Sequence, residues 1–507
     1  MWSILLLIAY YLWPIAITLL VIKLYQWWKF PHPRFPPGPR GLPFIGWPPS
    51  FANRLQSKEF EGLTKKYGYV IGGKLMGINY VILNKFEDIH DAFTKQGSVM
   101  SDRPMMHLLN DISGGYGLLE KNYNTACKLH RKFGSSFFKG FFTSGMDIEK
   151  ISANESHHFI QHLTKHAIGK PVDLTKIFYN ITANVISSIT LGRRFDYDDP
   201  TFRKIVKTST EIFGDSTDRK LVFSCLVLNT LRHIPPFQYA YQRYISMHKE
   251  IVDFIQQEID EHKKKFDPDN VNDFMDAFLK EQKFGPPKNQ PYFNDAELRG
   301  FVKDLFLAGT ETSSNTLSWA VAILLHHPEH MKRIQQEIDS VVGSNEQLTL
   351  SHRDSMPFSC AIIHEVMRYR TLIQLCVPHA TSKEVDLREF HLPKSTMIRA
   401  NLWAVHNDPA LWEEPHIFNP LRFLDESGNF VASPHFIPFG IGLRRCLGER
   451  IAKKEIFFFL ISLLQHFTLL PDPTAKKLPE IDTGSELLVY SPQKFKVVLR
   501  KRQPNRL

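Results

Sequence analysis

The sequence has few cysteines, and they lie far apart. Its 507 residues include five, namely Cys127, Cys225, Cys360, Cys376 and Cys446. An odd number at such spacings argues against a disulfide framework and favours a reducing compartment. The sequence also lacks a flexible Gly/Ser linker after residue 50. We therefore predict one large domain there rather than two or three.

A concentrated basic surface is absent as well. The net charge is +10, but the Lys and Arg residues are scattered, and none form a stripe interleaved with aromatic residues. This distribution argues against nucleic acid as a partner. An anionic membrane surface or an acidic protein is favoured instead.

The N-terminus has no charged residue between Met1 and Ile22. This apolar run is about as long as a membrane-spanning helix. It has no basic region before it and no small-residue cleavage site after it, so we predict a retained anchor rather than a signal peptide. The first positive charges follow the run, which places the rest of the chain in the cytosol. They are Lys23, Lys29, Arg34 and Arg40.

The division of the chain follows from these patterns. We predict a membrane anchor over 1–28, a proline-rich linker over 29–50 and a catalytic domain over 51–507. Residues 69–76 and 79–83 are β-like and joined at Gly77, and helical patterns dominate afterwards. The predicted fold class is mainly α with a small β-rich part, preceded by an N-terminal transmembrane helix.

The longest helical pattern begins after Asn294, a favourable N-cap, with Glu297 three residues later. It continues to about Leu325. Its middle, Ala-Gly-Thr-Glu-Thr-Ser-Ser over 308–314, suits a helix poorly, because glycine costs about 1 kcal/mol relative to alanine. The hydroxyl groups could simply bond to the preceding turn, or the run could serve a function.

A glycine-rich loop surrounds Cys446. Three glycines between Phe439 and Gly448 would let a flat, bulky group lie against the backbone. The helix predicted from Glu449 would favour a thiolate through its N-terminal dipole. An isolated cysteine is usually a buried apolar residue. No base or zinc-ligand cluster accompanies it, so a functional Cys446 suits a metal whose other ligands come from a cofactor.

The loop resembles the haem-binding signature of the cytochrome P450 family, Phe-x-x-Gly-x-Arg-x-Cys-x-Gly, at every fixed position. The run at 308–312 is similar to the family's oxygen-activation motif, Ala/Gly-Gly-x-Asp/Glu-Thr. The Pro-Pro-Gly-Pro hinge at 36–39 resembles that of the microsomal members of the family. The stretch 184–197 resembles one typical of the animal members that hydroxylate drugs and steroids.

This resemblance implies the P450 fold and a haem b cofactor whose iron takes Cys446 as its axial ligand. Phe439 and Gly440 would lie in the haem-binding loop. The oxygen-activation residues would be Ala308, Gly309, Glu311 and Thr312. In the family pattern, Gly309 would leave room for dioxygen, while Glu311 and Thr312 would hold water and relay protons.

The two haem propionates need cations or hydrogen-bond donors. By resemblance these groups would be Arg103, Arg131, His379 and Arg444. The family normally has Trp four residues before the position of Arg131. This sequence has Cys127 there, which removes an indole donor.

Glu365 and Arg368 are three residues apart on one predicted helical face. Such a pair is usually solvated, but its neighbours here are apolar, so burial with a further partner is expected. The family's Glu-x-x-Arg motif implies Arg422 as that partner. We assign the three residues to a structural clamp behind the haem loop.

The resemblance implies a monooxygenase that inserts one oxygen atom from O₂ into a lipophilic substrate, a steroid, fatty acid or xenobiotic. The chain has no Gly-rich dinucleotide motif, so electrons would come from NADPH through NADPH-cytochrome P450 reductase, a separate flavoprotein. Cytochrome b5 is a second implied partner. The implied location is the endoplasmic reticulum membrane. A basic docking face would include Lys128, Lys132, Arg445 and Lys453.

Two alternatives remain at this point. A haem-thiolate isomerase or dehydratase would rearrange a peroxide without a reductase, and a membrane haem carrier or sensor would have no activity. The proton-relay residues Glu311 and Thr312 argue against the first alternative, because that chemistry does not require them. The intact oxygen-activation motif argues against the second.

Overall fold

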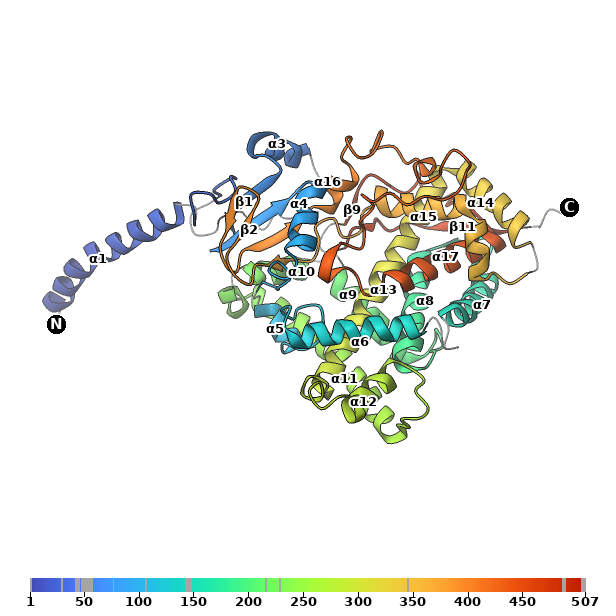
Figure 1. Cartoon of the computed structure of the whole chain (residues 1–507), viewed down its shortest axis with the longest axis horizontal. Helices are drawn as coiled ribbons and strands as arrows, with labels where there is room; N and C mark the ends of the chain where they lie inside the picture. The colour runs from blue at the N-terminus through green and yellow to red at the C-terminus, as the bar shows by residue number, and fades with distance from the viewer. Residues whose placement is uncertain are drawn as a thin grey trace.

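The structure is a computed structural model of the whole chain. It describes residues 2–28, 31–41, 46, 58–75, 77–104, 107–141, 148–214, 217–227, 229–343, 346–485 and 489–502. The described α-helices are α1 (Trp2–Trp28), α3 (Lys58–Tyr67), α4 (Phe86–His90), α5 (His107–Ser113), α6 (Thr125–Phe141), α7 (Ile148–His166), α8 (Leu174–Leu191), α9 (Pro200–Phe213), α10 (Thr217–Val227), α11 (Phe237–Lys265), α12 (Phe274–Phe284), α13 (Asp295–His326), α14 (Pro328–Val341), α15 (Pro357–Tyr369), α16 (Leu402–His406) and α17 (Glu449–His466) (Figure 1). A π-helical turn spans Asp91–Lys95.

The strands are short and form a minor part of the fold, as predicted. They are β1 (Val70–Leu75), β2 (Ile78–Leu83), β3 (Pro171–Val172), β4 (His379–Ala380), β5 (Val385–Leu387), β6 (Phe390–Leu392), β7 (Met397–Ala400), β8 (Phe467–Pro471), β9 (Gly484–Ser485), β10 (Ser491–Pro492) and β11 (Val497–Lys501). The predicted antiparallel pair is confirmed, with Val70 opposite Leu83. Met76, the predicted last residue of the first strand, lies outside the described residues.

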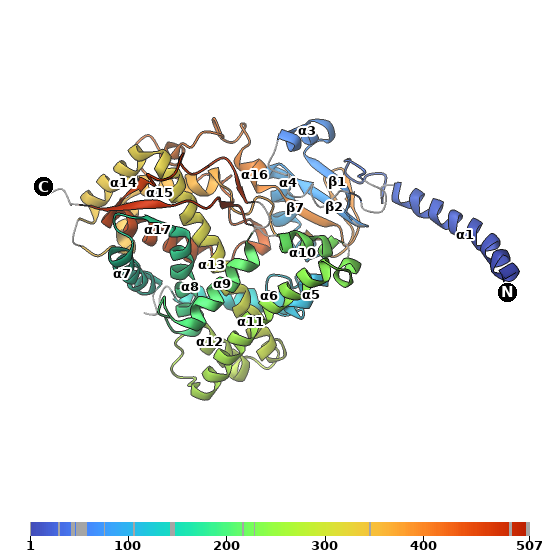
Figure 2. The same cartoon turned by 180° about the vertical axis from the view of Figure 1, so that it is seen from behind.

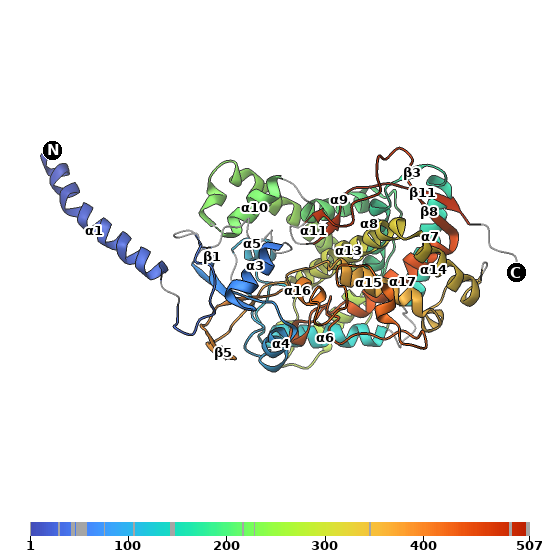
Figure 3. The same cartoon turned by 90° about the horizontal axis from the view of Figure 1, so that it is seen from above.

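The largest described sheet joins distant parts of the chain. Its strand order is β1-β2-β7-β4, and β2 and β7 are parallel. Figures 1 and 3 place this sheet on the α1 side of the body, away from α7 and α14. His379, the first residue of β4, is therefore held beside β7, in the same sheet as the N-terminal strands β1 and β2.

Helix α13 runs through the interior of the molecule (Figures 1 and 2). The predicted helix is confirmed: Asn294 is its N-cap and accepts a hydrogen bond from the Glu297 backbone N–H at 3.1 Å. The Glu297 side chain does not complete a capping box, since it contacts Lys121 and the Gly117 backbone N–H instead. Helix α13 therefore binds the loop after α5 at its first turn.

The largest hydrophobic core surrounds α13, α15 and α17. Trp319 on α13 and the consecutive Phe457, Phe458 and Phe459 on α17 are all less than 2% exposed. Successive helical residues point in different directions, so α17 must be covered on several sides. Cys446 lies just before a helix fixed in the core, and Ala308–Thr312 lie in the middle of another.

Helix α1 projects from the body in Figures 1 and 3. Several of its large apolar side chains between Tyr10 and Ile22 are exposed, by as much as 74% at Tyr10. No described helix combines the length and the hydropathy of a membrane span. After α1, the described part of the predicted linker contacts the body: Phe35 is buried, and Pro37 O accepts a hydrogen bond from Gly72 N on β1 at 2.9 Å.

Candidate functional site

The backbone of the Cys446 loop turns at two glycines. Gly440 and Gly442 have φ values of 69° and 76°, a region that L-residues with side chains rarely adopt. A Cβ at Gly442 would lie 1.9 Å from the carbonyl oxygen of Phe93, whereas a Cβ at Gly440 would meet no heavy atom within 4 Å. The loop is closed by the Cys446 backbone N–H, which donates to Phe439 O at 2.9 Å.

This pair of glycines provides a matched test of the loop. Gly440→Ala should lower the stability by about 1–2 kcal/mol through the positive φ alone. Gly442→Ala has the same strain plus the collision with Phe93, which adds about 1–3 kcal/mol. Urea titrations that follow the Soret band of the haem-containing protein would rank the two variants. Equal midpoints would show that the loop does not rest on the Asp91–Lys95 turn.

The Cys446 side chain is exposed, although dense protein surrounds it. That burial raises the pKa of the thiol, and the Gly448 N–H is the strongest opposing influence. The Gly448 N–H therefore favours the thiolate without outweighing burial, and the expected effect of the helix dipole stays a prediction. Coordination to a metal cation would ionise the thiol outright.

The burial of side chains along α13 is interrupted at the oxygen-activation motif, residues 308–312. Ala308 is exposed and Thr312 is partly exposed, while Leu307 and Thr310 are buried. Residues four apart lie on the same helical face. Helix α13 packs against α17, the helix that follows the Cys446 loop. This exposed strip on α13 and the exposed Cys446 thiol are what an internal binding space between the two elements would produce.

The hydroxyl groups of this segment bond to the preceding turn. Thr312 Oγ1 donates to Ala308 O at 2.6 Å, and Ser314 and Thr316 donate to the carbonyls four residues earlier. Such bonds explain how a helix accommodates the polar run. They do not occupy Thr312 fully, because a hydroxyl oxygen can accept further hydrogen bonds.

Glu311 is held by two residues that the sequence did not single out. Its Oε1 accepts hydrogen bonds from Tyr179 Oη at 2.9 Å and Asn315 Nδ2 at 2.8 Å. Burial is the main cause that raises the pKa of Tyr179, and the Glu311 carboxylate is the second. The hydroxyl therefore remains a hydrogen-bond donor at neutral pH. Helix α8 thus fixes the carboxylate in place.

Gly309 has a packing role in the structure. A Cβ there would lie 2.5 Å from Cδ1 of Ile186 on α8. The missing side chain thus makes room for α8. The room for dioxygen that the family resemblance implies at Gly309 stays a prediction. Ala308, one residue earlier, is the small residue with an exposed side chain.

The four predicted propionate-binding residues come from distant segments. Arg103 Nη1 lies 3.5 Å from His379 Nδ1 and 2.7 Å from Pro378 O, and burial lowers the pKa of Arg103 to about 9, with Arg444 as the second cause. Arg444 Nε donates to Ser101 O, and Arg131 Nη2 donates to Arg445 O. Within the described part of the chain, no carboxylate is bound to these three guanidinium groups.

His379 has an orphaned polar atom. Its Nδ1 lies 2.9 Å from Val377 O, while its buried Nε2 has no hydrogen-bond partner among the described residues. Burial, and then Arg103, hold the pKa of His379 well below its ordinary value. A ligand with two carboxylates would supply acceptors for the guanidinium groups and would favour the protonated imidazole.

Cys127 takes part in this cluster in place of the expected Trp. Its sulfur lies 3.0 Å from Arg444 Nη1, and burial raises the pKa of the thiol. A thiol is a weak acceptor, but it is small. Cys127 therefore contacts the guanidinium group of Arg444. The Trp expected at this position would instead have offered an indole N–H to a haem propionate.

The predicted clamp residues are brought together. Arg368 donates through Nε and Nη2 to both oxygens of Glu365, each at 2.7 Å, and both side chains are fully buried. Arg422 Nε donates to Glu365 Oε1 at 3.2 Å. Arg368 Nη1 also donates to the carbonyls of His406 and Pro415.

The clamp reaches the Cys446 loop through His406, which the sequence did not indicate. His406 Nε2 accepts from the Ile437 backbone N–H at 3.0 Å, just before the loop. Its Nδ1 lies 2.7 Å from Thr371 Oγ1. Burial, and then Arg368, lower the pKa of His406 to about 3, so the ring stays neutral and can accept this bond.

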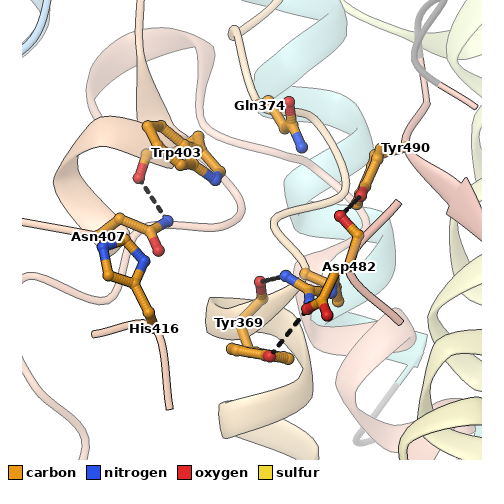
Figure 4. A pocket seen from close by; sticks show the side chains of 8 residues that line it. Tyr369, Gln374, Trp403, Asn407, His416, Asp482 and Tyr490 are labelled. Atoms are coloured by element: carbon orange, nitrogen blue, oxygen red, sulfur yellow. Dashed lines mark hydrogen bonds and ion pairs between the residues drawn. The ribbon is translucent and has the colours of Figure 1, made fainter. Parts of the chain in front are cut away.

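A separate cavity of about 150 Å³ contains none of the predicted site residues (Figure 4). Its polar groups largely satisfy one another. Arg370 pairs with Asp482 at 2.8 Å, Asn407 donates to Trp403 O, and Tyr490 Oη donates to Asp482 O. Because these polar groups are already bonded to one another, the cavity offers no reason to place the catalytic reaction there.

Comparison with known proteins agrees with this geometry. The family model for cytochrome P450 matches residues 36–499. The chain belongs to the cytochrome P450 family. It is 31% identical to cytochrome P450 2U1 of Bos taurus (96% of this chain and 94% of that protein), 34% identical to cytochrome P450 2D3 of Rattus norvegicus (97% and 98%) and 33% identical to cytochrome P450 2J5 of Mus musculus (92% and 91%).

The predicted resemblance, cofactor and enzyme class are therefore confirmed. This P450 is a haem-thiolate monooxygenase, and members of its family hold the iron of haem b through a cysteine thiolate. The described residues fit that group: Cys446 supplies an exposed sulfur, the cradle at Gly440 is open, and the guanidinium cluster lacks carboxylates. The isomerase and carrier alternatives are not favoured.

Proposed function

We propose that this P450 oxidises a lipophilic substrate with electrons that NADPH-cytochrome P450 reductase delivers from NADPH, with cytochrome b5 as a second partner. The observation that supports this most directly is the exposed strip of Ala308 and Thr312 in an otherwise buried helix. When bound, haem supplies the redox chemistry that activates dioxygen. The protein supplies the thiolate that binds the iron, the space in which the substrate binds and the residues that deliver protons.

Each predicted residue then has a defined task. Cys446 would bind the iron of the haem, and Phe439 and Gly440 would belong to the loop that holds it. The propionates are held by Arg103, Arg131, His379 and Arg444. Ala308 borders the substrate, and Thr312 Oγ1 holds a proton for reduced oxygen. Glu311, fixed by Tyr179 and Asn315, supplies protons toward Thr312.

The electron donor is proposed to dock on the basic face near the Cys446 loop. In the structure, Glu449 binds two of its cations: Arg445 at 2.6 Å and Lys453 at 2.8 Å. Lys128 lies over the Tyr123 ring. The Glu449 carboxylate therefore orients Arg445 and Lys453 at this face and reduces its net charge.

We also propose that residues 1–28 act as a single-pass anchor that holds this P450 at the endoplasmic reticulum membrane, with the catalytic domain in the cytosol. The exposed apolar side chains of α1 support this location, because water solvates such a surface poorly. The positive residues after Ile22 favour the cytosolic side.

Turnover measurements test the proposed reaction. With reductase and NADPH, the haem-containing protein should oxidise lipophilic substrates, and product formation should stop if either is omitted. Thr312→Val should lower the rate of product formation roughly 100-fold, because a positioned proton donor is lost. NADPH should still be consumed, with its electrons released as hydrogen peroxide.

Thr316→Val is the matched control, because Thr316 makes the same kind of bond one turn later, to Thr312 O at 2.9 Å. It should leave product formation within about twofold of wild type. An equal loss in both variants would assign Thr312 a purely structural role. Product formation from a peroxide substrate without reductase would favour the isomerase alternative.

A further inference from the structure

Helices α8 and α13 pack against each other along a row of polar side chains (Figure 2). Packed helices usually bury apolar side chains between them. On α13, however, three polar residues with helical spacing face α8, and each is at most 4% exposed. Two polar residues of α8, one turn apart, bond to them. We call the five residues the polar seam: Thr175, Tyr179, Glu311, Asn315 and Ser318.

Hydrogen bonds cross the polar seam at two levels. Near the start of α8, Ser318 Oγ donates to Thr175 Oγ1 at 3.2 Å. One turn further along α8, Tyr179 Oη donates to Glu311 Oε1 at 2.9 Å and accepts from Asn315 Nδ2 at 3.1 Å. Asn315 Nδ2 also donates to Glu311 Oε1, at 2.8 Å. The phenol, the amide and the carboxylate therefore form a closed triangle of hydrogen bonds.

Within this triangle the tyrosine is the group that can pass a proton to Glu311. A hydroxyl has one proton and two lone pairs. The bond to Glu311 uses the proton and the bond from Asn315 uses one lone pair, so the second lone pair can accept a hydrogen bond from water. The raised pKa of Tyr179, due first to burial, keeps that proton in place at neutral pH. The amide of Asn315 does not release protons, so it can only orient its two partners.

The polar seam leads from the surface of the molecule to the oxygen-activation motif. Lys176 is exposed, and Thr175 and Tyr179 are partly exposed, whereas Glu311 is buried. Glu311 directly precedes Thr312 in the motif. Tyr179 therefore stands between the accessible start of α8 and the carboxylate beside Thr312.

The packing of the two helices does not require the Tyr179 hydroxyl. Thr182 Oγ1 on α8 donates to the Thr310 carbonyl at 3.0 Å, and Gly309 leaves room for Ile186. These contacts hold α8 against α13 by themselves. A phenylalanine ring could fill the position of the tyrosine ring, so the hydroxyl is explained by its bond to the carboxylate.

We propose that Tyr179 is a positioning residue for the reaction: its hydroxyl holds the Glu311 carboxylate and passes protons to it from the start of α8. This inference rests on the proposed function, in which Glu311 supplies protons toward Thr312. In each transfer the hydroxyl gives its proton to Glu311 Oε1 and takes another from a hydronium ion. The phenol is therefore neutral before and after, the carboxylate becomes a carboxylic acid, and water is left behind.

Turnover of Tyr179→Phe tests the proton transfer. The full-length, haem-containing protein would be assayed with reductase, NADPH and 7-ethoxycoumarin as a lipophilic probe. The variant should lower kcat about tenfold, with KM within about twofold of wild type, because a proton path is lost while water can replace part of it. Less product should form for each NADPH consumed, and the ratio of kcat in H₂O to kcat in D₂O should rise. The spectrum of the reduced, carbon monoxide-bound protein should not change.

Tyr197→Phe is the matched control, because Tyr197 Oη makes the same kind of bond, to Glu155 Oε1 at 2.5 Å, outside the polar seam. It should leave kcat, the yield of product for each NADPH and the isotope ratio within about twofold of wild type. An equal loss in both variants would assign the Tyr179 hydroxyl a purely structural role and overturn the inference. Wild-type product yield and isotope ratio in Tyr179→Phe would overturn it as well.

An infrared difference spectrum tests the bond to Glu311 without turnover. Subtracting the spectrum of Tyr179→Phe from that of wild type should show a shifted stretching band of one carboxyl group. The shift should be absent when both proteins also carry Glu311→Gln. A shift that persists there would mean that Tyr179 acts on another group, which refutes the inference. If the shift depends on Glu311 but wild type forms no NADPH-dependent product, the proposed reaction fails and the positioning of Glu311 by Tyr179 stands.

Discussion

Replacing Cys446 by serine should abolish the red-shifted Soret band of the reduced, carbon monoxide-bound protein. That band reports a thiolate ligand to the iron, and Cys446 is the exposed sulfur in the predicted loop. A serine hydroxyl stays protonated and donates far less electron density. NADPH-dependent oxidation should fall to background. The measurement is a difference spectrum of wild type and variant at equal haem content.

The matched control is Cys225→Ser, which changes a buried cysteine on α10. It should retain the thiolate-type band, because Cys225 belongs to a separate small hydrophobic cluster. A wild type without the band, or a band that survives Cys446→Ser, would refute the assignment of the iron ligand.

The second large effect is expected at the buried clamp. Arg368→Leu should destabilise the protein by about 3–5 kcal/mol, because it leaves the Glu365 carboxylate buried without its bidentate partner. The carbonyls of His406 and Pro415 also lose their donor. Urea titrations followed by circular dichroism and by the Soret band should both shift to lower midpoints.

An exposed ion pair provides the comparison. Arg34 contacts Asp386 at 3.2 Å, with side chains 53% and 50% exposed. Solvent already screens these charges, so Arg34→Leu should barely move the midpoint. If Arg368→Leu were equally mild, the clamp would be dispensable for stability. If the Soret band alone were lost, the clamp would serve the haem loop rather than the fold.

The sequence predicted the parts of this site that depend on local patterns. Helix α13 could be predicted because its N-cap, periodic apolar residues and length all lie within one segment. The Cys446 loop could be predicted because its glycines, arginine and cysteine have a fixed spacing. Both are properties of neighbouring residues, which a single sequence displays directly.

The rest depended on contacts between distant segments. Tyr179 reaches Glu311 from α8, and His406 reaches Ile437, yet neither residue belongs to a recognisable local motif. Gly309 shows most clearly what a single sequence cannot predict. Its position in the motif was predicted, but the identity of the atom beside its missing Cβ, Ile186 Cδ1, depends on how two helices cross.

The bonds that join Glu365, Arg368, His406 and Ile437 connect three segments that are far apart in sequence. Opening any one of these segments would expose the buried charges of the others. Helix α15, the end of α16 and the approach to Cys446 should therefore exchange their amide hydrogens as one cooperative unit, with similar protection. The iron ligand would then be displaced only when the unit around it unfolds as a whole.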